Sequence, residues 1–293
     1  MTTVRETMRG LARDLGGGFI VQRLLPSARR QAVGPFVFMD HFGPVTVQPQ
    51  AAHDVRPHPH IGLATLTYLL EGAVMHRDSL GSAQEITPGA INWMTAGKGI
   101  VHSERRPRRL QGQAYVNHGF QLWCALPSAF EEVDPAFIHT PAEAIAQLWV
   151  QGVQVGVLVG EAFGARSPVA TFSPTTLLDV HLPADGALQL PALAAELAAY
   201  PIDGDIVVDG QVLGRQTLGL LASQQSCSLR SVRPTRVLVL GGEPLGHRFM
   251  QWNFVSSRRD RIAQAARDWQ EGRMAAVPGD DERIELPAAL APR

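Results

Sequence analysis

The fold of this chain is decided by one stretch, residues 58–104, which reads "HPHIGLATLTYLLEGAVMHRDSLGSAQEITPGAINWMTAGKGIVHSE". It consists of short runs rich in β-branched and aromatic residues, and glycine and proline turns separate these runs. Such spacing is typical of the many short strands of a sandwich or barrel. The pair Glu71-Gly72 lies between two of the runs and predicts the turn of a β-hairpin.

Each end of this stretch carries two strong metal-binding side chains, two residues apart. His58 and His60 stand at one end, and His102 and Glu104 stand at the other. Successive side chains of a strand point to opposite faces, so the two members of each pair share a face, with their bases about 6.6 Å apart. The two pairs can converge on one ion only if the strands close on each other, as they do in a small β-barrel.

The residues around these pairs favour a metal site with open coordination. Pro57 and Pro59 remove two backbone donors, which predicts an edge strand or the mouth of a barrel. Three imidazoles and a carboxylate include the two-histidine, one-carboxylate set that leaves positions open on ferrous iron. A structural zinc site usually closes at four ligands, often thiolates, and Cys124 and Cys227 lie outside both pairs. Each pair alone is typical of ordinary polar residues near a strand end, but their combination in a predicted barrel favours metal.

Similar turn-bounded runs lie outside this stretch, and one of them repeats part of it. The runs outside it cover residues 18–25, 35–42 and 118–126. Residues 66–81, "LTYLLEGAVMHRDSLG", align with residues 197–214, "LAAYPIDGDIVVDGQVLG", and Tyr68 then falls on Tyr200. The chain is therefore predicted to contain two copies of one β-rich unit.

The second copy lacks the metal-binding side chains. The positions that match His58 and His60 are Leu190 and Ala192, and no histidine lies between residues 182 and 246. We therefore expect a single metal site in the first barrel. The predicted domains are a metal-binding barrel over residues 1–138, a linker over 139–152 and a metal-free barrel over 153–293 that ends in a helix.

Two segments bear on helix content. Residues 191–201, "PALAAELAAYP", have the composition of a helix, but their place directly before a hairpin in the repeat predicts a strand. Residues 257–272, "SRRDRIAQAARDWQEG", predict a helix with Ser257 and Asp260 as a capping box and Gly272 at the stop. The apolar face of this helix comprises Ile262, Ala265, Ala266 and Trp269.

Composition excludes several classes of function. The 293 residues carry a formal net charge of -1, which argues against a nucleic-acid or membrane-surface protein driven by a basic face. The basic run at 105–109 is interpreted as a solvated loop, and the two cysteines as unrelated buried thiols. No signal peptide and no run of eighteen apolar residues is found, so a cytoplasmic location is expected.

Two other groups of residues are expected to bind neither a metal nor a nucleotide. His76 and Asp78 share a strand face after the hairpin turn, and we interpret them as structural, with Asp78 binding turn amides. The glycines of "LVGEAFGARSP" (158–168) lack the spacing of a nucleotide-binding loop.

At this point the motifs resemble those of the pirin family, a branch of the bicupins. Those motifs are H-P-H, T-x-T-Y, the E-G turn, H-R-D-S-x-G, P-G, W-M-x-A-G-x-G and H-S-E within 58–104, with "MDHFGP" (39–44) and "WNFVSSRRDRI" (252–262) outside it. The resemblance implies an all-β fold of two cupin-type β-barrels, with one mononuclear metal, Fe(II) above all, in the N-terminal barrel. Carried over by motif, its ligands are His58, His60, His102 and Glu104. His41, in the first outer motif, is the best of the lone histidines for lining the pocket.

The resemblance also implies an activity. Some pirins act as quercetin 2,3-dioxygenases, which open flavonols with O2 and release carbon monoxide, and Glu104 would then accept the proton of the substrate 3-hydroxyl as the catalytic base. Manganese, nickel, copper or zinc would fit the same donors. Two other readings stay open: a regulatory protein that acts through a protein partner and responds to the oxidation state of its metal, and a metal-stabilised scaffold without turnover.

Overall fold

The computed structural model describes residues 3–16, 18–51 and 53–288. Strands dominate this part of the chain, which contains a single α-helix, α1 (Arg259–Gln270), and three short 3-10 helices. The chain divides into two compact units. We call one the histidine barrel, and it comprises Ala12–Gln22, Asp40–His139 and Gly246–Arg293. We call the other the aliphatic barrel, and it comprises Met1–Leu11, Arg23–Met39 and Thr140–Leu245.

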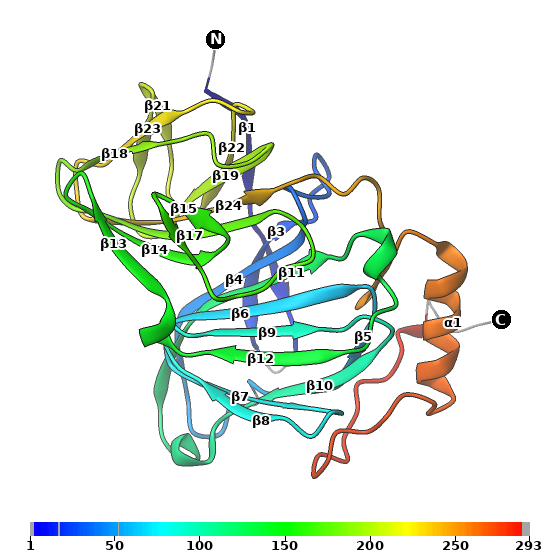
Figure 1. Cartoon of the computed structure of the whole chain (residues 1–293). Coiled ribbons are helices and arrows are strands. Elements are labelled where there is room, and N and C mark those ends of the chain that lie inside the picture. The colour runs from blue at the N-terminus through cyan, green and yellow to red at the C-terminus, as the bar shows by residue number, and fades with distance from the viewer. Residues whose placement is uncertain (1–2, 17, 52, 289–293) are drawn as a thin grey trace. The chain divides into compact units, whose positions relative to one another are not determined.

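The histidine barrel is built from two antiparallel sheets (Figure 1). The seven-stranded sheet has the order β12-β9-β6-β11-β4-β3-β2, and the four-stranded sheet the order β5-β10-β7-β8. The strands of the larger sheet are β2 (Leu11–Asp14), β3 (Ile20–Leu25), β4 (Phe36–Val47), β6 (Leu63–Glu71), β9 (Ile91–Thr95), β11 (Tyr115–Ala125) and β12 (Ala136–Thr140). Those of the smaller sheet are β5 (Val55–His60), β7 (Val74–Asp78), β8 (Ala83–Ile86) and β10 (Ile100–Arg105). Short 3-10 helices are η1 (Arg108–Leu110) and η2 (Ser128–Phe130).

The aliphatic barrel repeats this plan, with sheet orders β1-β22-β19-β24-β17-β14-β13 and β18-β23-β20-β21. Its larger sheet contains β1 (Val4–Arg9), β13 (Ala146–Val150), β14 (Val153–Val159), β17 (Thr175–Leu182), β19 (Glu196–Pro201), β22 (Thr217–Leu221) and β24 (Thr235–Gly242). Its smaller sheet contains β18 (Ala187–Leu190), β20 (Ile206–Val208), β21 (Gln211–Leu213) and β23 (Cys227–Arg230). The hairpin β15 (Glu161–Ala162)–β16 (Ala165–Arg166) and the 3-10 helix η3 (Ala142–Ala144) complete it.

The fold is therefore all-β with two cupin-type barrels, as expected. The predicted hairpin at Glu71-Gly72 is wrong, because β6 pairs with β9 and β11 whereas β7 pairs with β8 and β10. The connection between β6 and β7 passes from one sheet to the other. A glycine is required at its turn because Gly72 has a φ of +94° and a Cβ there would lie 2.5 Å from the carbonyl oxygen of Val116. The segment 191–201 contains a strand, β19, so its place in the repeat outweighs its helical composition.

The expected boundaries at 138 and 153 require a correction, because neither unit is one continuous stretch. The first strand, β1, pairs with β22 of the aliphatic barrel, where Met8 lies opposite Leu218. Residues 139–152 are not a free linker either, since β13 is an edge strand of the same sheet. Hydrogen bonding between strands far apart in the sequence decides these assignments, and no local pattern shows it.

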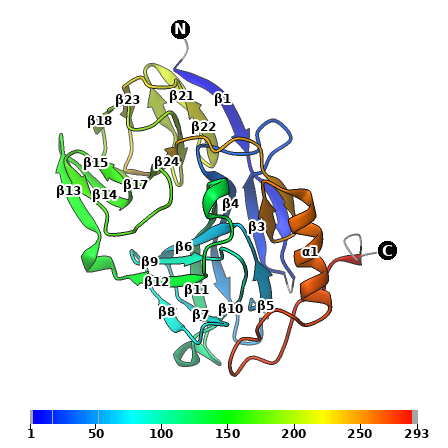
Figure 2. The same ribbon diagram turned by 45° about the vertical axis from the view of Figure 1, so that its right-hand side comes forward.

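The C-terminal helix belongs to the histidine barrel rather than to the second one (Figures 1 and 2). Its predicted apolar face is buried, and Ala265 and Trp269 pack in one cluster with Ile61 and Val101 of that barrel. The predicted capping box is wrong: α1 begins at Arg259 without a side-chain cap, because the backbone and hydroxyl of Ser257 donate to Glu131 instead. The hairpin β25 (Phe249–Gln251)–β26 (Phe254–Ser256) leads into it.

The basic run at 105–109 is only partly solvated. Arg105 forms a two-pronged ion pair with Asp280, and the guanidinium of Arg106 donates to three main-chain carbonyls of the 48–51 segment. These arginines therefore hold loops in place. Cys124 and Cys227 are free and buried, as expected. No helix in the described residues is long and apolar enough to span a bilayer.

Candidate metal centre

The two predicted ligand pairs lie on neighbouring antiparallel strands, β5 and β10. His58 lies directly opposite His102, and His60 lies opposite Ile100. β5 is an edge strand, which explains how it accommodates two prolines that cannot donate to a ladder. The register shifts between His102 and Glu104, so β5 carries an extra residue beside Pro57.

The three histidines meet inside the barrel. One ring nitrogen of each lies within 4.8 Å of a ring nitrogen of the other two. The ring centres of His58 and His102 are 4.4 Å apart, and both lie 5.0 Å from that of His60. The rings are buried, with 6% of His58 and 1% of the other two exposed. Glu104 is not a member of this group of three.

The hydrogen bonds orient these rings for a metal. Nδ1 of His58 donates to the carbonyl of Arg56 at 2.8 Å, and Nδ1 of His60 donates to the carbonyl of Asn253 at 3.1 Å. A carbonyl oxygen only accepts, so both rings carry their proton on Nδ1 and keep a lone pair on Nε2. Nε2 of His102 is buried and has no hydrogen-bond partner in the described part of the chain. Unpaired buried nitrogen of this kind is costly unless an ion binds it, so the three residues fit a metal.

The electrostatics of the site favour neutral imidazoles. Burial lowers the pKa of His58 to about 4. Burial, followed by the charges of neighbouring histidines, holds the pKa of His60 and of His102 well below the usual range. Metal ligation requires the neutral ring, so near neutral pH no proton has to leave before an ion binds.

Glu104 lies at the edge of this group. It is half-buried and shares a face of β10 with His102, and across the ladder it lies opposite His76 of β7. The hydroxyl of Thr67, on the facing sheet, lies 3.2 Å from Oε1 of Glu104 and 2.9 Å from Oε1 of Gln121. Burial raises the pKa of Glu104, although His76 and Thr67 act in the opposite direction.

His76 and Asp78 lie beside the histidines. Asp78 accepts hydrogen bonds from the backbone amides of Leu80 at 2.9 Å and Ser82 at 3.1 Å, which confirms its structural role at the turn. It also accepts one from Nε2 of His76 at 2.9 Å, and Nδ1 of His76 lies 3.4 Å from Nδ1 of His102. The structure therefore adds a contact with His102 to the structural role that the sequence predicts for this pair. The available signal was a second pair with two-residue spacing on the strand next to His102.

His41 does not line the site. Trp123 of β11 packs edge-on against His60, with ring centres 5.0 Å apart, so the odd-numbered side chains of β11 face the histidines. Phe120 points to the opposite face, and His41 stacks on it at 4.6 Å and shares a hydrogen bond with His118. Burial, and then the charge of His118, lowers the pKa of His41 to about 3.

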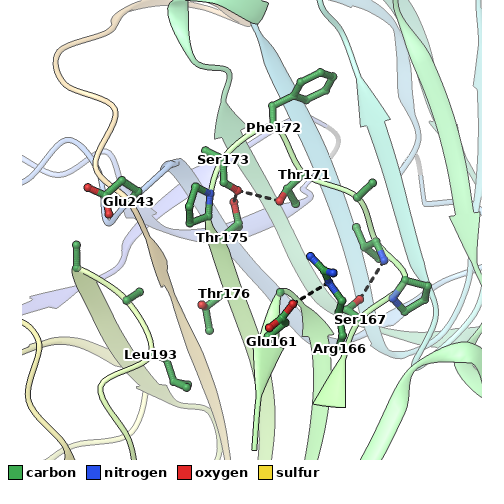
Figure 3. A pocket seen from close by; sticks show the side chains of 17 residues that line it. Glu161, Arg166, Ser167, Thr171, Phe172, Ser173, Thr175, Thr176, Leu193 and Glu243 are labelled. Atoms are coloured by element: carbon green, nitrogen blue, oxygen red, sulfur yellow. Dashed lines mark hydrogen bonds and ion pairs between the residues drawn. The ribbon is translucent and has the colours of Figure 1, made fainter. Parts of the chain in front are cut away.

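The aliphatic barrel carries an open hollow of about 890 Å³ (Figure 3). The glycine-containing stretch 158–168 contributes to its wall through the hairpin β15–β16. Glu161 and Arg166 on this wall pair with each other at 2.9 Å, and both are exposed. The hydroxyls of Thr171 and Thr175 donate to the carbonyl of Ser173. Glu161, Arg166, Thr171 and Thr175 therefore have protein partners, unlike the unpaired nitrogen of His102.

Known proteins resemble this chain over nearly its whole length. The Pirin family model matches residues 18–124, and the model of the pirin C-terminal cupin domain matches residues 177–275. A pirin-like protein of Caulobacter vibrioides is 46% identical over 279 residues, which cover 94% of this chain and 96% of that relative.

Two crystal structures of quercetin 2,3-dioxygenase from Acinetobacter baumannii are also similar. One superposes with a TM-score of 0.89 at 34% identity and covers 97% of this chain and 95% of its own. The other superposes with a TM-score of 0.85 at 27% identity and covers 94% and 99%. With two cupin barrels, both family models and a relative at 46% identity, the chain belongs to the pirin family.

Proposed function

We propose that this protein is a metal-dependent dioxygenase that opens flavonol-like, enolic substrates with O2. The observation that carries the proposal is the convergence of three buried, neutral imidazoles, one with an unpaired nitrogen, beside a half-buried carboxylate. The name quercetin 2,3-dioxygenase, which two similar crystal structures bear, supports the substrate class.

His58, His60 and His102 would hold the metal, and we propose Glu104 as the fourth ligand. The proposed ion is Fe(II), although the same donors also suit manganese, nickel, copper or zinc. A divalent metal with open coordination positions supplies Lewis acidity and, in the case of iron, reactivity toward dioxygen. A cytoplasmic location is part of the same proposal, since a reducing compartment suits both a ferrous ion and two free buried thiols.

Glu104 is the proposed general base. A raised pKa makes a carboxylate a stronger base, and burial acts in this direction on Glu104. Its carboxylate would accept the proton of the substrate 3-hydroxyl, which leaves an electron-rich enolate. The hydroxyl of Thr67 orients the carboxylate from the facing sheet. In the overall reaction both atoms of O2 enter the opened product, and one ring carbon leaves as carbon monoxide.

Oxygen uptake by protein loaded anaerobically with Fe(II) tests this function. With quercetin and a panel of flavonols and simpler enols, we expect consumption of O2 and formation of carbon monoxide. Glu104→Gln should retain metal and lose turnover by about 100-fold or more, the usual range for loss of a general base. Glu85→Gln, which changes a carboxylate paired with Arg109, is the matched control and should leave turnover unchanged.

Two results would reject the proposal in different ways. Equal turnover in Glu104→Gln and the parent protein would exclude Glu104 as the base. No oxygen uptake with any compound of the panel, in protein shown by metal analysis to contain iron, would exclude the dioxygenase activity. A change in affinity for a protein partner on oxidation of the iron would then favour the regulatory reading.

A further inference from the structure

His102 differs from the other two histidines in how its ring is held. His58 and His60 donate to the main-chain carbonyls of Arg56 and Asn253. A substitution of Arg56 or Asn253 leaves that carbonyl in place. The ring of His102 makes its contact through Nδ1 with a side chain, that of His76. Its orientation therefore depends on residues that mutation can remove.

His76 is itself held by two neighbours, Phe137 and Asp78. It is 4% exposed, its ring stacks on Phe137 with centres 4.1 Å apart and planes at 10°, and its Nε2 lies 2.9 Å from Oδ2 of Asp78. Asp78 is fully buried, and its other oxygen accepts the amides of Leu80 and Ser82. The amides of the turn therefore fix the position of the Asp78 carboxylate, and this carboxylate fixes the ring of His76.

These contacts dictate where the protons lie. A carboxylate that accepts two amide hydrogens accepts from Nε2 of His76 as well, so this nitrogen carries the proton of His76. In the neutral ring Nδ1 is then an acceptor. Its hydrogen-bond partner is Nδ1 of His102 at 3.4 Å, which places the proton of His102 on Nδ1. Nε2 of His102 is left with a free lone pair, and this is the buried nitrogen without a protein partner.

We infer that His76 and Asp78 are positioning residues of the metal centre, which hold His102 in the tautomer and orientation that present Nε2 to the ion. Partners of this kind fix the ring of a metal-binding histidine and raise its basicity. The aliphatic barrel supplies an independent comparison: where the strand pairing of the first barrel has His76 opposite Glu104, that of the second has Val208 opposite Leu229. The inference rests on the proposed metal centre but not on dioxygenase chemistry.

The first test uses metal-free protein and no variant. Long-range ¹H–¹⁵N NMR of the histidine side chains distinguishes the two neutral tautomers. We expect His102 to carry its proton on Nδ1 and His76 to carry its proton on Nε2. A metal-free protein with His102 protonated on Nε2 overturns the inference, whatever the enzyme activity.

The second test compares variants by Zn(II) titration. His76→Phe keeps a ring against Phe137 and removes the acceptor, so we expect a Kd about 10- to 100-fold higher. His76→Gln restores both functions, because its oxygen accepts from His102 and its amide donates to Asp78, and it should recover most of the affinity. His139→Phe is the matched control, since His139 bonds Asn92 in the same barrel, and it should bind as the parent does.

Asp78→Asn provides an answer if His76→Phe fails to fold. The new amide can donate to Nε2 of His76 and so force its proton onto Nδ1, facing His102. We expect NMR to show His102 protonated on Nε2 in this variant, and Zn(II) binding to weaken by a similar factor. A folded His76→Phe or Asp78→Asn protein with the Zn(II) affinity of the parent contradicts the inference.

Discussion

The two barrels of this protein share a strand order but have interiors of opposite chemical character. In the histidine barrel the small sheet, β5-β10-β7-β8, places imidazoles in the interior. In the aliphatic barrel the corresponding sheet, β18-β23-β20-β21, contributes to a cluster of buried valines and leucines. One backbone plan therefore supports a site in one copy and a closed core in the other.

The strand register shows which residues correspond at the centre of the site. β5 and β10 place His58 opposite His102, and β18 and β23 place Leu190 opposite Cys227. Both counterparts belong to the apolar core of their barrel and are at most 2% exposed. The counterpart of His58 is the one that the sequence repeat predicted.

The next pair of opposed residues along the sheet also changes from polar in the histidine barrel to apolar in the aliphatic barrel. His76 faces Glu104 between β7 and β10, and Val208 faces Leu229 between β20 and β23. β7 begins six residues after Tyr68, and β20 begins six residues after Tyr200, so the two copies align without a gap. The difference between them shows that side chains at a few shared positions, not the backbone, decide which barrel can bind an ion.

Exchange of side chains at one shared position gives the largest expected effect. Leu229→Glu would bury an unpaired carboxylate in the aliphatic core, and we expect it to lower the free energy of unfolding by about 4 kcal/mol. The reverse change, Glu104→Leu, should cost about 1 kcal/mol or less, because burial already disfavours the charge of Glu104. Urea unfolding measures both changes in the free energy of unfolding. Equal losses in the two variants would show that the two interiors do not differ in how they accommodate a carboxylate.

Metal should stabilise one barrel selectively. Zn(II) at about 100 times its Kd should protect the histidine barrel by about 3 kcal/mol, because only the folded site binds it. Hydrogen exchange should show slower exchange of β5 and β10 amides and unchanged exchange in β18 and β23. His102→Ala should abolish the effect and bring metal content to background. Protection of both barrels to the same extent would contradict a single site.

In the aliphatic barrel, the charge of Asp179 lies on the strand face opposite the apolar core. Asp179 of β17 is buried but alternates with the core residues Leu178 and Val180, and it binds Nε of Arg236 at 2.8 Å. Burial acts to raise the pKa of Asp179, but hydrogen bonds from Arg236 and His181 outweigh it and lower the pKa to about 2.

A depressed carboxyl pKa contributes stability above the unfolded value, near 3.9, and loses it as pH falls through the folded value. Asp179→Asn should therefore cost about 2 kcal/mol at pH 7, and the difference from the parent should shrink toward zero as the pH approaches 2. Urea unfolding between pH 2 and pH 7 measures it. A constant difference across this range would show that the carboxylate charge contributes nothing.

The smallest effect is expected at His41. It lies on the face of the sheet opposite the three histidines, so His41→Phe should leave the Zn(II) Kd unchanged. Loss of its hydrogen bond with His118 should cost about 1 kcal/mol of stability. Isothermal titration and urea unfolding separate the two quantities, and a weaker Kd would place His41 within the site.

Local rules were sufficient for much of this protein. Alternation along a strand predicts that His58 shares a face with His60, and glycine and proline spacing predicts the barrels and the turn after β6. The internal repeat predicts Leu190 in place of His58. These features depend on a residue and its near neighbours, which is why they can be read from the chain.

Other features arise only when distant strands pair. Asn253 supplies the carbonyl that orients His60 across 193 positions, and His76 orients His102 across 26. The same long-range pairing assigns β1 to the aliphatic barrel and packs α1 against the histidine barrel. The sequence by itself determined the donor types and their spacing, whereas the tertiary structure alone decided which nitrogen each ring presents, because a proton on imidazole follows the acceptor that folding brings to it.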